Sequence, residues 1–192
     1  NPTCELSVAL IHHPVLNKLG EVIISSVTNL DLHDIARSAR TFGLSHYYVV
    51  HPTKSLRRLS EKICEHWETG FGSIYNPNRS DALRTISIVP DLDDVLTDIE
   101  ARTGKMPKVI TTSARDESKA VSFSELRGKI YGSSDPHLLL LGTGWGLTRE
   151  IIDRAEYHLE PVRGHSDYNH LSVRAAAAII FDRLFGDRRS VV

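Results

Sequence analysis

The chain has 192 residues, 41% of them hydrophobic, so it can bury one substantial core and is short for two independent domains. The formal net charge of −1 gives no global attraction to nucleic acid, so a nucleic-acid site would have to come from a local cluster. No apolar stretch is long enough to span a bilayer and the first residues lack the pattern of a signal peptide, so we expect a single cytoplasmic domain over residues 1–192 that does not enter a membrane.

Strand and helix signals alternate along the chain. Short runs of residues that favour strands are mostly bounded by turn residues. Several of these runs are apolar with little alternation, as strands covered on both faces are, which predicts an α/β fold with a mainly parallel sheet flanked by helices. The predicted strands cover residues 6–11, 47–50, 86–89, 109–112 and 138–141.

Three helical patterns lie between these strands, each with a residue able to cap its first turn. Asn29 is expected to cap the first helix, which Gly43 would end. Thr53 is expected to cap the second helix, and Asp91 the third, which Gly104 would end. In the second helix, the positions expected to face the core are Leu56, Leu59, Ile63 and Trp67.

The first helix also carries a basic stripe opposite its apolar face. His33, Arg37 and Arg40 share this face at helical spacing. Arginine offers a planar fork of donors that suits phosphate, so the stripe could bind RNA. A solvated face with ordinary charges has the same pattern and stays open as an alternative.

Residues 70–80 are rich in Gly, Pro and Asn, which predicts a long loop. Tyr75 and Arg79 in this stretch could stack on and bind an unpaired base. A packed surface loop with no ligand is the alternative.

A glycine loop follows the last apolar strand. Residues 138–147 read as a buried strand that runs into Gly142-Thr143-Gly144-Trp145-Gly146, which indicates a nucleotide-like cofactor. One interpretation is an NAD-binding oxidoreductase, with Glu160 as the ribose ligand after a possible strand at 157–159. The Gly-x-Gly-x-Gly spacing departs from the dinucleotide fingerprint, and a tight turn without a ligand is a further alternative.

Three motifs together resemble a known family. Asn29 with residues 35–43 is similar to the first motif of ribose-methylating SPOUT enzymes, an Asn followed by an Ile-x-Arg-Thr-Ala-x-x-Phe-Gly helix. Residues 138–147 are similar to the second, an apolar strand leading into a Gly-rich turn that ends Trp-Gly-Leu. Residues 160–161 and 171–180 resemble the third, a proline-marked loop before an alanine-rich helix. The chain thus resembles the SPOUT superfamily of S-adenosylmethionine-dependent RNA methyltransferases, most closely a small bacterial branch related to tRNA guanine-N1 methyltransferase.

The resemblance implies a homodimer in which the C-terminal segment of each chain is threaded through a loop to form a trefoil knot. It implies an enzyme that transfers the methyl group of S-adenosylmethionine to tRNA or rRNA and releases S-adenosylhomocysteine. The first expectation for the acceptor is a ribose 2′-oxygen, because the Arg37 helix most resembles that group, and guanine N1 is the second. The second motif lacks the usual Glu, and Asn169 sits one place early in the third. A degenerate module that binds cofactor or RNA without turnover is therefore a further alternative.

The motifs and the resemblance together predict which residues bind the cofactor, contact RNA and act in catalysis. The glycines at 142, 144 and 146 would let the backbone approach the cofactor closely. The cysteines and histidines lack partners at ligand spacing, so we expect no bound metal. The residues expected to act in catalysis are Arg37, Asn29 and Ser172. Those expected to contact RNA are His33, Arg40, Tyr75 and Arg79. Those expected to bind the cofactor are Leu140, Leu141, Gly142, Thr143, Gly144, Gly146, Leu147, Leu159, Glu160, Pro161, Asn169, His170 and Leu171.

The last helix, expected over residues 171–185, is apolar nearly all round, which is more than one sheet face can cover. Burial within the knot is one interpretation, and a homodimer contact is the other. Arg174 would project beside apolar residues of this helix. We expect it to have a carboxylate or phosphate partner, because an unpaired buried cation is costly.

Overall fold

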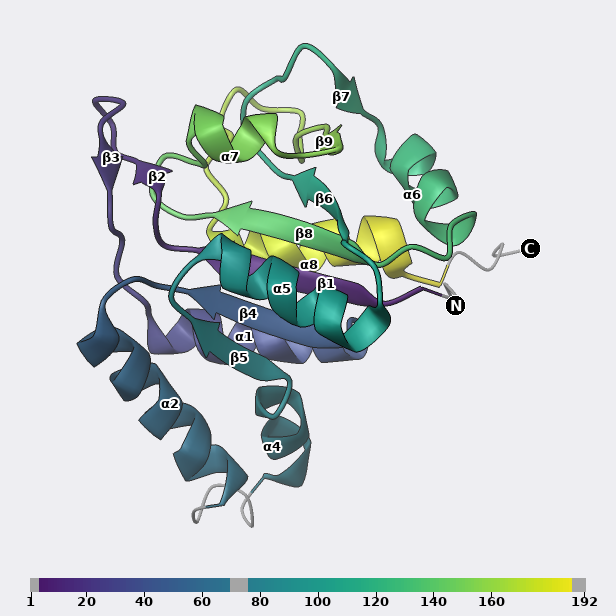
Figure 1. The fold of residues 1–192 in the computed structure, drawn as a ribbon. Coiled ribbons are helices and arrows are strands. Elements are labelled where there is room, and N and C mark those ends of the chain that lie inside the picture. The colour runs from purple at the N-terminus through teal and green to yellow at the C-terminus, as the bar shows by residue number, and fades with distance from the viewer. Residues whose placement is uncertain (1–3, 70–75, 188–192) are drawn as a thin grey trace.

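The structure is a computed structural model that describes residues 4–69 and 76–187. Its centre is a sheet of seven parallel strands in the order β5-β4-β1-β8-β6-β9-β7 (Figure 1). The predicted parallel sheet is confirmed, and the predicted strands shift by at most one residue at either end. The strands are β1 (Leu6–Ile11), β4 (His46–Val50), β5 (Ile86–Val89), β6 (Lys108–Thr111), β7 (Ala120–Val121), β8 (His137–Gly142) and β9 (Tyr157–Leu159).

Helices cover both faces of the sheet, which explains why β1 and β8 are apolar without alternation. Residues of α1, α4, α6 and α8 share one core with the sheet, and residues of α5 and α7 share the other. Figure 1 shows α5 on the near side of the sheet and α1 and α8 behind it. The helices are α1 (Asn29–Thr41), α2 (Lys54–Glu68), α4 (Pro77–Leu83), α5 (Leu92–Thr103), α6 (Phe123–Tyr131), α7 (Arg149–Asp153) and α8 (Val173–Phe185).

Two predicted helix starts are confirmed. Asp91 caps α5, which ends at Gly104 in the left-handed conformation. Thr53 stands at the N-cap position of α2, but its side chain makes no capping hydrogen bond. The predicted cap of α1 is wrong by one residue. The side chain of Thr28 accepts the N–H of Asp31, so Asn29 is already inside the helix.

Two further expectations about this half of the chain are corrected. Leu59 is 55% exposed, because the inward face of α2 passes through Ser60 and Cys64 instead. The predicted loop over residues 70–80 gives way to α4 from Pro77, which Asn76 caps by accepting the N–H of Arg79. Residues 70–75 of that stretch lie outside the described residues.

The last helix, α8, packs against α1 and α6. Its buried side chains include Ala177, Ile180 and Phe181, so the chain itself covers one face of this helix. Arg174 makes ion pairs with Asp31 at 3.1 Å and with Asp34 at 3.4 Å, which confirms the expected carboxylate partner. No helix of the described residues is long and apolar enough to cross a membrane.

A small hairpin stands apart from the main sheet. Its strands, β2 (Val15–Leu16) and β3 (Val22–Ile23), pair antiparallel, and Figure 1 shows them projecting beyond the carboxyl ends of the central strands. Leu16 donates its N–H to the carbonyl of Gly146 at 2.9 Å, and Val15 forms a bridge with Leu147. The hairpin therefore packs directly on the glycine loop.

Candidate cofactor and acceptor site

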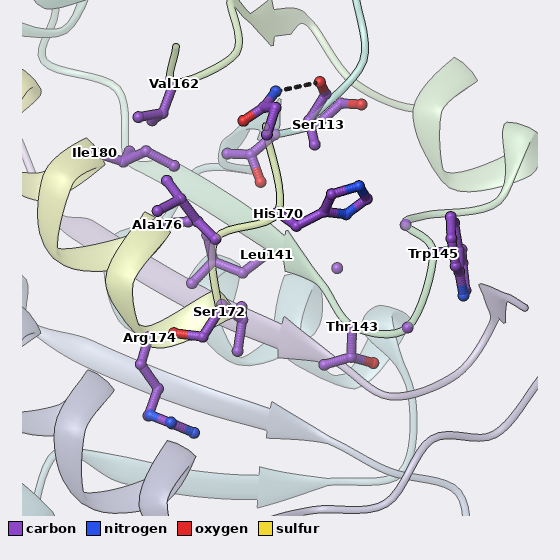
Figure 2. A pocket seen from close by; sticks show the side chains of 18 of the residues that line it. Ser113, Leu141, Thr143, Trp145, Val162, His170, Ser172, Arg174, Ala176 and Ile180 are labelled. Carbon is purple, nitrogen blue, oxygen red and sulfur yellow. Dashed lines mark hydrogen bonds between the residues drawn. The ribbon is translucent and has the colours of Figure 1, made fainter. Parts of the chain in front are cut away.

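A cavity of about 740 Å³ opens where three adjacent strands end. The loops that follow β8, β6 and β9 line it, together with the first turns of α1 and α8 (Figure 2). Open parallel sheets bind ligands at the carboxyl ends of their strands, and the volume lies within the range of small-molecule sites. Ten of the expected site residues line the cavity: Leu141, Gly142, Thr143, Gly144, Gly146, Glu160, Asn169, His170, Leu171 and Ser172.

The packing and the backbone conformation of the chain itself require the glycines of the loop. A Cβ at Gly144 would lie 2.8 Å from the carbonyl oxygen of Leu16, and a Cβ at Gly142 would lie 3.1 Å from the backbone nitrogen of Leu147. Both positions are crowded by the chain itself. Gly146 has open space around it and a φ of +108°, so its backbone conformation alone favours glycine. The expected close approach of a cofactor to the backbone of this loop stays a prediction.

Hydroxyl groups tie the same loop to the end of β1. The hydroxyl of Thr143 donates to the carbonyl oxygen of Ile11 at 2.9 Å and is hydrogen-bonded to the hydroxyl of Ser25. Ser25 and Thr143 both line the cavity. The loop is thus held on two sides, by the hairpin and by β1, before any ligand binds.

The floor of the cavity carries a buried carboxylate. Asp31 is 6% exposed; one carboxylate oxygen accepts from the hydroxyl of Thr28 at 2.6 Å, and the other accepts from Arg174 at 3.1 Å. Ser172 lies beside it and caps α8, its hydroxyl accepting the N–H of Ala175. Each carboxylate oxygen has a further lone pair, so Asp31 can accept one more hydrogen bond from a ligand.

Hydrogen bonds fasten the loop between β9 and α8 to its surroundings at several points. Glu160 accepts the N–H of Phe123 at 2.7 Å. Asn169 donates to the carbonyl oxygen of Ala114 at 3.0 Å, the bond drawn in Figure 2. Glu160 therefore supports the loop at the start of α6, which differs from the free ribose ligand of the dinucleotide interpretation.

Four residues expected to bind the cofactor do not line the cavity. Leu140 belongs to the core on the α5 side of the sheet, because successive strand residues point to opposite faces and Leu141 faces α8. Leu147 packs into the same α5 core. Leu159 and Pro161 are buried without lining the cavity, although Glu160 and Val162 beside them do.

Two of the residues expected to act in catalysis are also placed elsewhere. Arg37 is exposed on α1, two turns beyond the cavity floor, and does not line the cavity. Asn29 lines a separate, shallow groove of about 280 Å³ beside α2. Within one chain, only Ser172 of the three reaches the cavity.

The residues expected to contact RNA do not form one cluster in the structure. His33 packs edge-on against Trp67, and the guanidinium of Arg79 lies 4.7 Å from the centre of the Trp67 ring. Burial, followed by the charge of Arg79, lowers the pKa of His33. Arg40 pairs with Asp81 on the surface. Tyr75 lies outside the described residues.

Several residues that line the cavity were not predicted from the sequence. The loop after β6 could have been found from the rule that parallel strands present their carboxyl ends to a ligand. Trp145 lies in the glycine loop, and Val173, Arg174, Ala176 and Ile180 lie in the third motif, but neither motif assigns them a site role. Ser25, Ser26, Asp31 and Val162 are not among the motif residues. The lining residues without an expected site role are Ser25, Ser26, Asp31, Thr112, Ser113, Ala114, Arg115, Trp145, Val162, Val173, Arg174, Ala176 and Ile180.

The two ends of the cavity differ in chemistry. Val162, Ala176 and Ile180 gather at one end in Figure 2, and the glycine loop with Trp145 lies at the other. An apolar slot bordered by loop backbone suits the adenine of an adenosyl compound, whereas hydroxyl and backbone groups suit its polar parts. In the described residues no group of three His, Cys, Asp or Glu side chains could hold a metal ion.

Comparison of the sequence with known protein families identifies the family of this chain. The family described as SAM-dependent RNA methyltransferase matches residues 5–186. The chain belongs to this family. The cofactor of this family is S-adenosylmethionine, and the family match gives the NAD-binding oxidoreductase alternative no support.

Two relatives show how much of a longer protein the chain spans. It is 44% identical to a tRNA (guanine-N(1)-)-methyltransferase of Oleidesulfovibrio alaskensis over 97% of this chain and 43% of that protein. It is 38% identical to an uncharacterised protein of Aquifex aeolicus over 95% of this chain and 89% of that protein. The chain therefore spans less than half the length of the first relative.

Solved structures share the fold at low identity. The SpoU methyltransferase AviRb from Streptomyces viridochromogenes, solved with AdoMet, has a TM-score of 0.57 and 16% identity over 96% of this chain and 60% of that chain. The Aquifex aeolicus TrmH/SpoU tRNA modifying enzyme has a TM-score of 0.54 and 14% identity over 96% of this chain and 74% of that chain. The family match over residues 5–186 confirms the expected RNA methyltransferase family, and these structures show that the chain shares the fold of SpoU-type enzymes.

Proposed function

We propose that this chain is a tRNA methyltransferase module that methylates a guanine base at N1, with Asp31 as the proton acceptor. The observation that carries the proposal is the buried carboxylate on the cavity floor, hydrogen-bonded to Thr28 and paired with Arg174. Relatives named tRNA (guanine-N(1)-)-methyltransferase support this acceptor over the ribose oxygen.

The chemistry needs both members of that pair. S-adenosylmethionine would supply the methyl group: the acceptor atom would bond to the methyl carbon in line with the breaking C–S bond, and S-adenosylhomocysteine would leave as a neutral thioether. Guanine N1 carries a proton and gains nucleophilicity when that proton leaves, and a carboxylate within hydrogen-bond reach can take it. The negative charge that then spreads over the base is stabilised by a nearby cation, a role that fits Arg174.

The first expectation, ribose methylation, depended on Arg37. That side chain is exposed and lies outside the cavity of its own chain, whereas Asp31 from the same helix lines it. A carboxylate is a conventional proton acceptor near neutral pH, and a guanidinium is not, because it stays protonated. The base nitrogen is therefore the acceptor that the geometry supports best.

The proposal includes the remaining features of the family resemblance. The segment between β9 and α8 passes the loop after β6, to which Asn169 and Arg163 bind, and this passage supports a C-terminal trefoil knot. Leu171, which lines the cavity, and Leu30, which precedes the lining residue Asp31 on α1, are exposed apolar side chains. We propose that a second copy covers them in a homodimer. The described residues would then form one methyltransferase domain that acts on cytoplasmic tRNA.

The test uses nucleoside mass spectrometry after incubation of the protein with labelled S-adenosylmethionine and bulk tRNA. The expected product is 1-methylguanosine, at a rate that Asp31→Asn lowers by about 10²–10³-fold. Asp34→Asn is the matched control, because Asp34 also pairs with Arg174 but does not line the cavity. A 2′-O-methylated product would restore the ribose acceptor. Tight S-adenosylhomocysteine binding with no product on any RNA would indicate a module without turnover.

A further inference from the structure

Three aromatic rings form a row, and two of them line the cavity. Trp145 is 44% exposed on the glycine loop, and Tyr168 is 74% exposed on the loop before α8. His170 lies between them, with its ring centre 6.4 Å from that of Trp145 and 5.3 Å from that of Tyr168. Figure 2 shows the His170 ring reaching across the opening toward Trp145.

The backbone of Trp145 is fixed although its ring is exposed. Its N–H donates to the carbonyl oxygen of Leu16 at 2.8 Å, and the next residue, Gly146, accepts from the N–H of Leu16 at 2.9 Å. Leaving half of a large apolar ring in water forgoes stabilisation that burial would give. A ring that is exposed on a rigid backbone is instead suited to stack on a planar ligand without a large loss of side-chain entropy.

We propose that the exposed ring of Trp145 binds an unpaired RNA base by stacking and holds it at the entrance of the cavity, and that Tyr168 is available to stack on a neighbouring base. The proposal rests on the proposed function, because it assumes an RNA acceptor. Base recognition outside a duplex commonly combines aromatic stacking with a cation for the backbone. Arg115 supplies that cation: it is exposed, it lines the same cavity, and no ion pair is found for it within residues 4–69 and 76–187.

The position of the row favours an RNA base over the adenine of the cofactor. The apolar end of the cavity, with Val162 and Ile180, is enclosed by α8 and offers the slot that a cofactor would fill. The ring of Tyr168 is three-quarters exposed and is not part of the cavity lining. A macromolecule can cover such a ring, whereas a small molecule inside the cavity leaves it in water.

Tryptophan fluorescence tests the proposal, because the chain has two tryptophans. Trp67→Phe leaves Trp145 as the single reporter. Titration with a single-stranded, guanine-containing pentaribonucleotide is expected to quench this emission. In calorimetry on the wild-type background, Trp145→Ala is expected to weaken binding of the same oligonucleotide by about 5- to 100-fold while S-adenosylhomocysteine affinity holds. Tyr131→Ala, at an exposed tyrosine of α6, is the matched control and should leave both affinities unchanged.

Two outcomes would overturn the stacking proposal. Oligonucleotide affinity that does not change in Trp145→Ala would exclude the ring from RNA binding. Quenching by S-adenosylhomocysteine alone, together with loss of its affinity in Trp145→Ala, would assign the ring to the cofactor. Failure of the proposed function is distinguishable, because oligonucleotide binding that depends on Trp145 can be measured whether or not methyl transfer occurs.

Discussion

Gly144 and Leu16 meet backbone to backbone: a Cβ at residue 144 would lie 2.8 Å from the carbonyl oxygen of Leu16. That carbonyl also accepts the N–H of Trp145. The β2–β3 hairpin therefore shapes the glycine loop, which in turn lines the cavity. Substitutions that move the hairpin should therefore change the affinity for the cofactor, because they move the glycine loop.

The contact predicts unequal effects of two glycine substitutions. Gly144→Ala combines a left-handed residue with a clash against Leu16, and we expect it to lower the free energy of unfolding by about 2–3 kcal/mol. Gly20→Ala, at a φ of +80° with open space around it, should cost only about 1 kcal/mol. Urea unfolding measures both values. S-adenosylhomocysteine affinity should fall for Gly144→Ala alone; equal effects of the two variants would contradict the role of the hairpin.

The Asp31–Arg174 pair predicts a measurable coupling. In a double-mutant cycle of Asp31→Asn and Arg174→Met, we expect a coupling free energy of about 1–3 kcal/mol, because Asp31 is buried and bonded on both oxygens. The cycle of Asp34→Asn with Arg174→Met should give less than about 1 kcal/mol, since Asp34 is half exposed. Denaturant unfolding of the single and double variants provides the values. A larger coupling free energy for Asp34 than for Asp31 would mean that Arg174 pairs mainly with the exposed Asp34 and not with Asp31 on the cavity floor.

The sequence predicts the sheet well and the floor of the site poorly, for physical reasons. Strand runs such as residues 138–141 carry their own signal in local composition, and so does the glycine loop. Leu140 and Leu141 could not be told apart, because a strand buried on both faces shows no alternation. Asp31 resembles an ordinary helix charge, and its partner Arg174 is 143 residues away in sequence. Contacts of that separation leave no local pattern in a single sequence.

A buried histidine behind the floor predicts loss of stability in acid. His12 is fully buried, with no hydrogen-bond partner for its ring nitrogens among the described residues. Burial, followed by the charge of His51, lowers its pKa from 6.5 to about 4. Between these values the unfolded chain binds more protons than the folded chain, so the free energy of unfolding falls as the pH falls through this interval.

The acid effect of His12 should amount to about 3 kcal/mol between about pH 7 and pH 4. His12→Phe removes the titrating group, so its unfolding free energy should depend less steeply on pH over this interval. His51, whose pKa burial also lowers, acts in the same direction and should leave a residual slope. Urea unfolding at several pH values measures both slopes. An equal slope in wild type and His12→Phe would show that His12 is not buried as a neutral ring.

Substitution of Arg37 distinguishes guanine N1 from the ribose 2′-oxygen as the methyl acceptor. Because this side chain is exposed and lies outside the cavity, guanine N1 methylation through Asp31 predicts that Arg37→Ala keeps S-adenosylhomocysteine affinity and changes the single-turnover rate by less than about threefold. Arg40→Ala, on the same face of α1, is the matched control. A loss of about 10²–10³-fold in Arg37→Ala alone would mean that the guanidinium acts in a cavity it does not reach in its own chain. Mixing Arg37→Ala with Asp31→Asn would then decide the matter: recovered activity would place Arg37 in the cavity of a second copy, and the acceptor would have to be assigned again from the methylated nucleoside.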